Sequence, residues 1–104
     1  MNDQELVNKV IQGDQHATRQ LIEQYQRLVV HTVARLIDDN QDREELCQDV
    51  FMKVFKHIGS FKFDSKLSTW IATIAYRLAI NFLKKQKRRK EEQDLDKVAF
   101  ELGT

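Results

Sequence analysis

Apolar residues recur at steps of three and four along most of the chain, which is the spacing of one face of an α-helix. The longest such pattern lies between Leu67 and Lys90, where neither proline nor glycine interrupts it. Its apolar stripe consists of Leu67, Trp70, Ile71, Ile74, Ala75, Leu78 and Phe82. A helix of about 24 residues would run roughly 36 Å at 1.5 Å per residue. Its opposite face is aromatic and hydroxylic first and basic later: Thr69, Thr73, Tyr76, Arg77, Ile80, Lys84, Lys87 and Arg88.

Two shorter helices are predicted at the start of the chain. The first runs from Asp3, as its N-terminal cap, to Gln12. Gly13 is expected to end it, because glycine accepts the left-handed conformation common after a helix C-terminus. Asp14 would then cap a second helix that extends to about Ile37. The apolar face of this second helix consists of Ala17, Leu21, Tyr25, Leu28, Val29, Thr32, Val33 and Leu36.

A third helix is predicted to begin at Asp42, which together with Glu45 resembles a capping box, and to end at Gly59. Its inward residues are Leu46, Val50, Phe51, Val54, Phe55 and Ile58. Its outward residues are Glu44, Glu45, Gln48, Asp49, Met52, Lys53 and Lys56. The segment 59–66 is the one predicted loop, and Asp64 or Ser65 is expected to cap the last helix. Residues 91–104 are predicted to form a weak helix or a frayed tail.

The composition agrees with an all-α protein of one domain. The chain has no proline and three glycines in 104 residues, which favours long helices joined by few turns. Hydrophobic residues at 41% and charged residues at 32% are typical of a soluble globular domain. The single cysteine, Cys47, excludes an internal disulfide and suits a reducing compartment. Because no signal peptide or membrane-spanning run is present, a cytoplasmic location is expected.

The net charge of +1 conceals a marked asymmetry. Residues 61–90 contain nine Lys or Arg and one Asp or Glu, whereas residues 91–104 contain one Lys and five Asp or Glu. Six cations occupy seven positions near the end of the last predicted helix: Lys84, Lys85, Lys87, Arg88, Arg89 and Lys90. Cations there complement the helix dipole, but six are more than the dipole requires. The block therefore favours a polyanionic partner, and a helix-capping role is the alternative.

No catalytic or metal-binding chemistry is predicted. His16, His31 and His57 lie far apart in the sequence, with no carboxylate or thiolate at ligand spacing. The serines and threonines form no nucleophile turn, and no glycine-rich phosphate loop is present. We therefore expect a binding protein that needs no cofactor. Trp70, at the margin of its apolar stripe, is either a core residue or a stacking platform for a nucleobase.

Several motifs in order resemble region 2 of bacterial sigma factors, most closely the extracytoplasmic-function (ECF) group. The motifs are Gly13-Asp14-x-x-Ala17 with Leu21 and Tyr25, Asp42-x-Glu44-Glu45-Leu46-x-Gln48-Asp49-Val50-Phe51, Ser68-Thr69-Trp70-Ile71, Ile74-Ala75, Ala79 and Leu83. A basic run follows them, and the likeness covers roughly residues 5–90. In that family, region 2 docks on the clamp helices of the RNA polymerase β′ subunit, and it recognises and melts the minus-ten promoter element.

The resemblance implies a four-helix, all-α region 2 domain at residues 1–90, with a loop before a long basic C-terminal helix. Residues 91–104 would be the start of an interdomain linker or a frayed tail. The implied partners are core RNA polymerase, the non-template strand of the minus-ten element and an anti-sigma factor. The implied polymerase-binding residues, on the outer face of the third helix, are Gln48, Asp49, Met52, Lys53 and Lys56.

The loop from Ser60 to Lys66 resembles the one that captures a flipped base in this family. The start of the last helix would line the non-template strand, and its basic end would hold upstream duplex phosphates. The implied DNA-binding residues are Phe61, Lys62, Phe63, Asp64, Lys66, Thr69, Trp70, Thr73, Tyr76, Arg77, Lys84, Lys87 and Arg88.

Two departures leave the recognised base open. The family usually has Arg-Asn where this chain has Tyr76-Arg77, and Asp where it has Asn81. The chain also stops where the interdomain linker would begin, so it is either part of a longer protein or a single-domain relative. Two other functions stay open: a sigma-like module that binds only an anti-sigma factor, and a basic helix on an acidic membrane. The second is disfavoured because the cations encircle the helix end.

Overall fold

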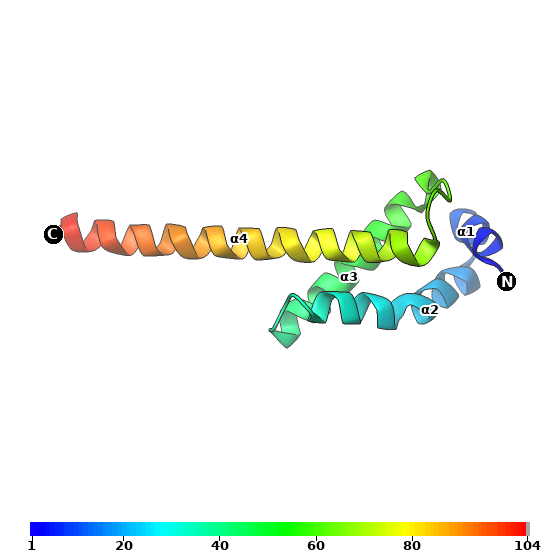
Figure 1. The fold of residues 1–104 in the computed structure, drawn as a ribbon, viewed down its shortest axis with the longest axis horizontal. Coiled ribbons are helices and arrows are strands. Elements are labelled where there is room, and N and C mark those ends of the chain that lie inside the picture. The colour runs from blue at the N-terminus through cyan, green and yellow to red at the C-terminus, as the bar shows by residue number, and fades with distance from the viewer. Residues whose placement is uncertain (104) are drawn as a thin grey trace.

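Four α-helices account for most of residues 1–103, the part of the chain that the computed structural model describes. They are α1 (Asp3–Ile11), α2 (Gln15–Ala34), α3 (Asn40–His57) and α4 (Leu67–Gly103), with a 3-10 turn η1 (Ile58–Ser60) after α3. No strand occurs in this part of the chain, so the all-α prediction is confirmed. Figure 1 shows α2 and α3 beside the first half of α4, α1 beyond the start of α4, and the two ends of the chain at opposite ends of the molecule.

The second half of α4 projects from the rest of the molecule (Figure 1). The molecule measures 66 × 24 × 23 Å and has a radius of gyration of 18.2 Å. A compact domain of this length would have a radius of about 13 Å. The difference arises because α4 has 37 residues and every residue from position 84 to 103 is exposed. The projecting part is therefore available to partners on all its sides.

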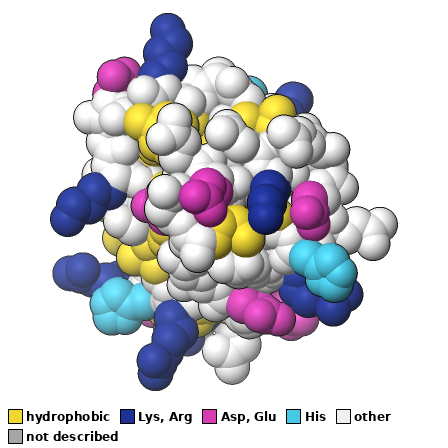
Figure 2. Space-filling model, turned by 90° about the vertical axis from the view of Figure 1, so that its right-hand side faces the viewer, with side chains coloured by type: hydrophobic (Ala, Val, Ile, Leu, Met, Phe, Trp, Pro, Cys, Tyr) yellow, Lys and Arg dark blue, Asp and Glu magenta, His cyan; other side chains and the backbone are white. Residues whose placement is uncertain are grey.

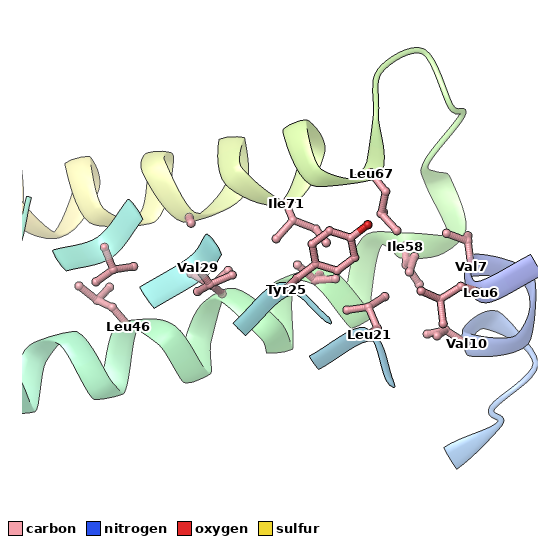
Figure 3. Packing of buried hydrophobic residues seen from close by; sticks show 14 of the residues in the cluster. Leu6, Val7, Val10, Leu21, Tyr25, Val29, Leu46, Ile58, Leu67 and Ile71 are labelled. Atoms are coloured by element: carbon pink, nitrogen blue, oxygen red, sulfur yellow. The ribbon is translucent and has the colours of Figure 1, made fainter. Parts of the chain in front are cut away.

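The core is built from the predicted apolar faces of all four helices. Every fully buried side chain among residues 1–103 is hydrophobic. Figure 3 shows Leu6, Val7 and Val10 of α1 gathered beside Ile58 at one end of this core. The remaining buried residues are Ala17, Leu21, Tyr25, Val29, Val33, Ile37, Leu46, Val50, Val54, Leu67, Ile71, Ala75 and Ala79. This packing fixes how α4 is rotated about its axis, and hence which of its side chains face solvent.

Two of the predicted helix caps are wrong. The side chain of Asn2, not Asp3, caps α1 by accepting the backbone N–H of Glu5 at 2.8 Å. Asp39 caps α3 by accepting the backbone N–H of Asp42 at 2.9 Å, so α3 begins earlier than predicted. In both places, two good cap formers stand within three positions of each other, and local sequence does not choose between them.

The predicted turn between α1 and α2, with Gly13 ending the first helix and Asp14 capping the second, is confirmed. Asp14 caps α2, its Oδ1 accepting the backbone N–H groups of His16 at 2.9 Å and Ala17 at 3.1 Å. Gly13 has φ +87°, in the left-handed region that glycine adopts without steric cost. Its N–H donates to the Val10 carbonyl, and the Asp14 N–H donates to the Lys9 carbonyl, both at 3.0 Å. This pair of bonds is a Schellman motif, which satisfies carbonyls at the end of α1.

The side chain of Arg43 closes the turn between α2 and α3. Its guanidinium donates to the Ile37 carbonyl and, at 3.3 Å, to the Ala34 carbonyl. A third donation reaches the side-chain oxygen of Asn40 at 3.4 Å. The last carbonyls of a helix have no partner inside the helix, and Arg43 supplies one for α2. The helix ends at Ala34, three residues before the predicted Ile37.

Helix α4 is longer than predicted. It does not end near Lys90 and continues to Gly103, so of the two alternatives predicted for this segment residues 91–103 form the helix and not the frayed tail, while Thr104 lies outside the described residues. No helix breaker occurs between positions 67 and 102, and oppositely charged residues are spaced four apart, as at Lys87 and Glu91. These local features let the helix run past its last core contact.

The expected cap of α4 is also wrong. The backbone N–H of Trp70 donates to the Lys66 carbonyl at 3.1 Å, which makes Lys66 the N-terminal flanking residue. The hydroxyl of Ser65 donates to that same carbonyl at 3.3 Å, instead of accepting a helix N–H. Among the hydrogen bonds of residues 1–103, Asp64 takes no part as a cap. Its carboxylate is therefore available to a ligand of the loop.

The buried Tyr25 predicts how stability depends on alkaline pH. Burial raises the pKa of its phenol above 10.0, and the Asp3 carboxylate, which accepts the Tyr25 hydroxyl at 3.4 Å, raises it further. A raised pKa means that this contribution to stability is complete below pH 10.0 and is lost as pH rises through the folded-state value.

We expect Tyr25→Phe to lose about 1 kcal/mol or less at neutral pH, the usual worth of one hydrogen bond. It should also show a weaker decline of stability above pH 10.0 than the wild type. Urea unfolding at a series of alkaline pH values measures both effects. Tyr76→Phe, which removes the hydroxyl of a tyrosine that is 53% exposed, is the matched control. Parallel pH profiles for wild type and Tyr25→Phe would contradict the assignment.

Candidate nucleic-acid interface

The loop between η1 and α4 is organised by three aromatic rings. Phe61 lies in the middle: its ring centroid is 4.6 Å from that of Phe63 and 5.1 Å from that of Trp70. Phe61 and Trp70 are half-buried and pack against the core. Trp70 therefore packs against the core, as one of the two alternatives expected, while its ring also contacts the loop aromatic Phe61; its role as a stacking platform for a base stays a prediction.

Phe63 is held in a strained backbone conformation. Its φ is +60°, in the left-handed region, where a Cβ meets the following carbonyl. Its side chain is 43% exposed, so burial does not explain the strain. Strained non-glycine residues concentrate at binding sites, where the surrounding structure holds them in place. Phe63 is therefore the loop aromatic best placed to meet a ligand.

A small hollow of about 170 Å³ lies between this loop and the start of α4. Its lining residues are Ser60, Phe61, Lys62, Asp64, Ser65 and Trp70. The structure thus brings together four of the predicted DNA-binding residues. The hollow offers aromatic surface, one cation, and a carboxylate that can accept hydrogen bonds. Those are the groups that bind an unstacked base by its face and its polar edge. Lys66, also predicted, is exposed in the same loop.

The outer face of α4 carries the other predicted strand contacts. Thr69, Tyr76 and Arg77 are exposed, and Thr73 is partly exposed. The Thr73 hydroxyl donates to the Thr69 carbonyl at 2.8 Å, so in this arrangement its oxygen can only accept hydrogen bonds from a ligand. Phosphates lack such donors, whereas base edges have N–H groups, so Thr73 suits a base more than a phosphate.

Tyr76 does not share the hollow of the loop. It lines a separate slot with residues at the end of α2, namely Thr32, Arg35 and Leu36. None of these three was predicted to bind DNA. Thr32 and Leu36 belonged to the expected apolar seam of α2, and no local signal distinguished Arg35 from other surface cations. Of the residues on the predicted outer face of α4, Tyr76 therefore lines this slot, whereas the loop hollow is lined by Trp70 from the apolar stripe.

The basic run lies where α4 leaves the core. Leu83 is the last α4 residue packed against the core, and the next one, Lys84, begins the exposed part. All six cations of the run are exposed, including the predicted DNA-binding residues Lys84, Lys87 and Arg88. Figure 2 views the opposite end of the molecule, where basic, acidic and histidine side chains are mixed. The run of six cations in seven positions therefore lies at the other end of the core, where α4 begins to project.

The predicted polymerase-binding residues lie on the outer surface of α3. Gln48, Asp49, Met52, Lys53 and Lys56 are all exposed, and Met52 is 70% exposed. Gln48 also borders a groove of about 400 Å³ between α2 and α3. The other lining residues are Ile22, Gln26, Val30, Arg43, Glu44, Cys47 and Phe51.

The apolar part of this groove was missed from the sequence. Phe51 packs against the core as expected, but it is half-buried and also lines this groove, and its ring stacks on Phe55 at a centroid distance of 6.5 Å. Val30 lies outside the predicted apolar face of α2 and is 45% exposed. An apolar residue at such a position was the sequence signal that could have revealed the groove. Burial raises the pKa of the Cys47 thiol, so Cys47 is protonated at neutral pH and acts as a small apolar residue.

The described residues hold neither a metal-binding cluster nor a membrane-spanning helix. Within positions 1–103, no three His, Cys, Asp or Glu side chains are grouped so as to hold a metal ion. Over the same positions, none of the helices combines the length and the apolar character needed to cross a lipid bilayer.

Comparisons with known proteins agree with this geometry. The chain belongs to the Sigma-70 region 2 family, whose family model matches residues 21–89. It is 36% identical over 101 residues to the ECF RNA polymerase sigma-E factor of Escherichia coli K12, covering 97% of this chain and 52% of that protein. It is 33% identical over 93 residues to the RNA polymerase sigma-H factor of Pseudomonas aeruginosa, covering 89% and 48%. The chain thus spans about half the length of these relatives.

A solved structure shares the fold. The NMR structure of an engineered region 2 of sigmaE in complex with GTAAAA matches with a TM-score of 0.76 and 37% sequence identity. The match covers 86% of this chain and 93% of that one. The predicted resemblance to region 2 of ECF sigma factors is confirmed by these comparisons.

Phe61 and Phe63 should respond differently to truncation. We expect Phe61→Ala to lower the free energy of unfolding by about 2 kcal/mol, less than a fully buried phenylalanine, because it is half-buried. Phe63→Ala should change it by about 0.5 kcal/mol, as surface substitutions do. It should nevertheless weaken binding of a short single strand by about 5-fold or more, the loss of one stacking contact. Urea unfolding and fluorescence anisotropy measure the two effects.

The matched control for Phe63 is Phe100→Ala, which removes a phenylalanine that is 74% exposed on the projecting part of α4. It should alter neither stability nor strand binding. Equal strand affinities for Phe63→Ala and Phe100→Ala would show that the strained loop residue makes no contact with DNA.

Proposed function

We propose that this chain acts in transcription initiation as region 2 of a sigma factor, recognising and melting the promoter minus-ten element while docked on RNA polymerase. The observation that carries the proposal is the aromatic and basic hollow between the loop and α4. It occurs in a fold shared with a sigmaE region 2 that was solved with GTAAAA. Binding energy, without catalysis, would melt the minus-ten element. The protein would act in the cytoplasm, where polymerase acts.

Strand opening would be driven by capturing bases as they leave the duplex. Each base stacked on an aromatic side chain contributes about 1–3 kcal/mol. One stacking step of duplex DNA is worth about 1.4 kcal/mol on average. Capture in the loop hollow can therefore offset about one step, and phosphate contacts by Lys84, Lys87 and Arg88 add sequence-independent affinity. Docking on polymerase would supply the rest and hold the strand in place.

The docking surface would combine the exposed ridge of α3 with the adjoining groove. The β′ clamp helices present helical side chains, and a helix that meets a partly apolar groove buries its anchors there. Phe51, Val30 and Ile22 would supply apolar surface, and Asp49 and Gln48 would supply polar contacts at the edge. An anti-sigma factor is a further proposed partner, because covering either surface would prevent initiation.

The test of this function is fluorescence anisotropy on a panel of labelled single strands, GTAAAA and variants that differ at one base. The wild type should prefer one strand over a scrambled sequence. Arg77→Ala should reduce that preference by about 5- to 140-fold, since a bidentate donor gives about 1–3 kcal/mol of discrimination. Its affinity for an arbitrary strand should fall much less.

Arg19→Ala, which removes an exposed cation from α2, is the matched control and should not affect preference. Equal binding of all strands by the wild type would contradict a role in minus-ten recognition and favour a protein-binding module. If Arg77→Ala weakens every strand equally, Arg77 contacts phosphate and the base is selected elsewhere.

A further inference from the structure

A slot between α2 and α4 has the size and lining of a nucleotide site. It has a volume of about 290 Å³ and is lined by Tyr76 of α4 and by Thr32, Arg35 and Leu36 near the end of α2. One water takes about 30 Å³ in the liquid, so the slot has room for about ten. The slot is therefore large enough to admit a planar heterocyclic base.

The four lining side chains offer complementary chemistry. Tyr76 is 53% exposed and presents an aromatic ring, and Leu36 is a half-buried apolar contact. The Thr32 hydroxyl donates to the Leu28 carbonyl at 2.8 Å, which leaves its oxygen to accept from a ligand. Arg35 is exposed, and its guanidinium makes no hydrogen bond or ion pair with any residue from 1 to 103. The slot therefore combines a stacking surface, an acceptor and an uncompensated cation.

The slot cannot receive the same base as the loop hollow. Trp70 lines the hollow and Tyr76 lines the slot, and the two hollows share no residue. On a helix, six positions separate two side chains by about 9 Å along the axis and about 120° around it. One continuous strand that crosses the exposed face of α4 could nevertheless place different nucleotides in each.

We propose that the slot lined by Tyr76 and Arg35 captures a second unpaired nucleotide of the bound strand, with its base on Tyr76 and its phosphate on Arg35. The inference rests on the proposed function and adds a second capture site to it. An unpaired guanidinium beside an exposed aromatic ring suits a ligand that is both planar and anionic. An apolar protein side chain would leave Arg35 without a partner.

The test is an abasic scan of GTAAAA, in which each base in turn is removed and the affinity is measured by anisotropy. For the wild type, removal of the captured base should lower affinity by about 5- to 140-fold, from about 1–3 kcal/mol of stacking per base. In Tyr76→Ala, removal of the same base should lower affinity by less than about 2-fold, because the ring on which that base stacks is already absent. Arg35→Ala should weaken the intact strand and flatten the salt dependence by about one unit.

Two variants serve as matched controls. Tyr76→Phe keeps the ring and should show the same loss of affinity as the wild type for each removed base. Arg19→Ala removes an exposed cation from α2 and should leave the affinity for the intact strand unchanged. Lys62→Ala should alter the scan at a different position, which belongs to the loop hollow. If Tyr76→Ala leaves every abasic penalty as in the wild type, the second site is wrong while the loop site stands. If the wild type binds every strand of the one-base panel and a scrambled strand equally, the proposed function itself fails.

Discussion

Replacing Lys84, Lys87 and Arg88 together with alanine is expected to remove most of the salt dependence that α4 contributes to promoter binding. Each phosphate contact releases counterions and adds a slope of about −0.9 to the plot of log affinity against log salt. Three lost contacts flatten that slope by about two to three units. Between about 50 and 200 mM salt, the wild type should therefore lose about 40-fold more affinity than the variant.

The control for this triple variant changes three exposed cations elsewhere, Lys9, Arg19 and Lys97, to alanine. It alters the net charge equally but leaves the basic run of α4 intact. Titrations of a duplex promoter fragment at several salt concentrations compare the proteins. Identical slopes for both triple variants would show that the α4 cations are solvated and do not contact phosphate.

Reversing the charge of Asp49 is expected to abolish binding to polymerase while the fold is unaffected. Asp49 is exposed on α3, and surface substitutions change stability by about 0.5 kcal/mol or less. A charge that becomes buried opposite the wrong partner costs about 2–5 kcal/mol, which is about 30-fold or more in affinity. A pull-down with the β′ clamp helices measures binding, and circular dichroism during heating measures helicity and melting temperature.

Asp96→Arg makes the same charge reversal on the exposed, projecting part of α4 and should leave clamp-helix binding unchanged. Retained binding by Asp49→Arg would remove the α3 ridge from the docking surface. Loss of binding together with a lower melting temperature would point to a folding defect instead. In that case, Met52→Asp on the same ridge provides the second test, because Met52 is 70% exposed and lies outside the core.

The existence of the helices could be read from local periodicity, but their ends could not. Core positions such as Leu21 and Ile71 recur at helical spacing, and both are fully buried. The wrong caps, Asp3 and Asp42, each stand near another good cap former. Asn and Asp cap a helix about equally well, and a cap is worth only about 1 kcal/mol, so packing of the helix against its neighbours can decide between them.

Part of the candidate site was also predictable, because its residues are close in sequence. Phe61, Lys62 and Trp70 lie within ten positions, and the turn into α4 brings them to one hollow. Arg35 and Tyr76, in contrast, are 41 positions apart and meet only because α2 packs against α4. No pattern in either segment indicates that these two residues line the same slot.

The sequence by itself determined the all-helical class, the inward faces and the basic block, since these depend on composition and on spacing along one segment. Only the tertiary structure decided which exposed side chains share a hollow. A helix turns its side chains by about 100° per residue, so their directions in space depend on how its buried stripe is seated. Burial of Ile71, Ala75 and Ala79 seats α4 so that Trp70 lines the hollow of the loop and Tyr76 lines the slot beside α2.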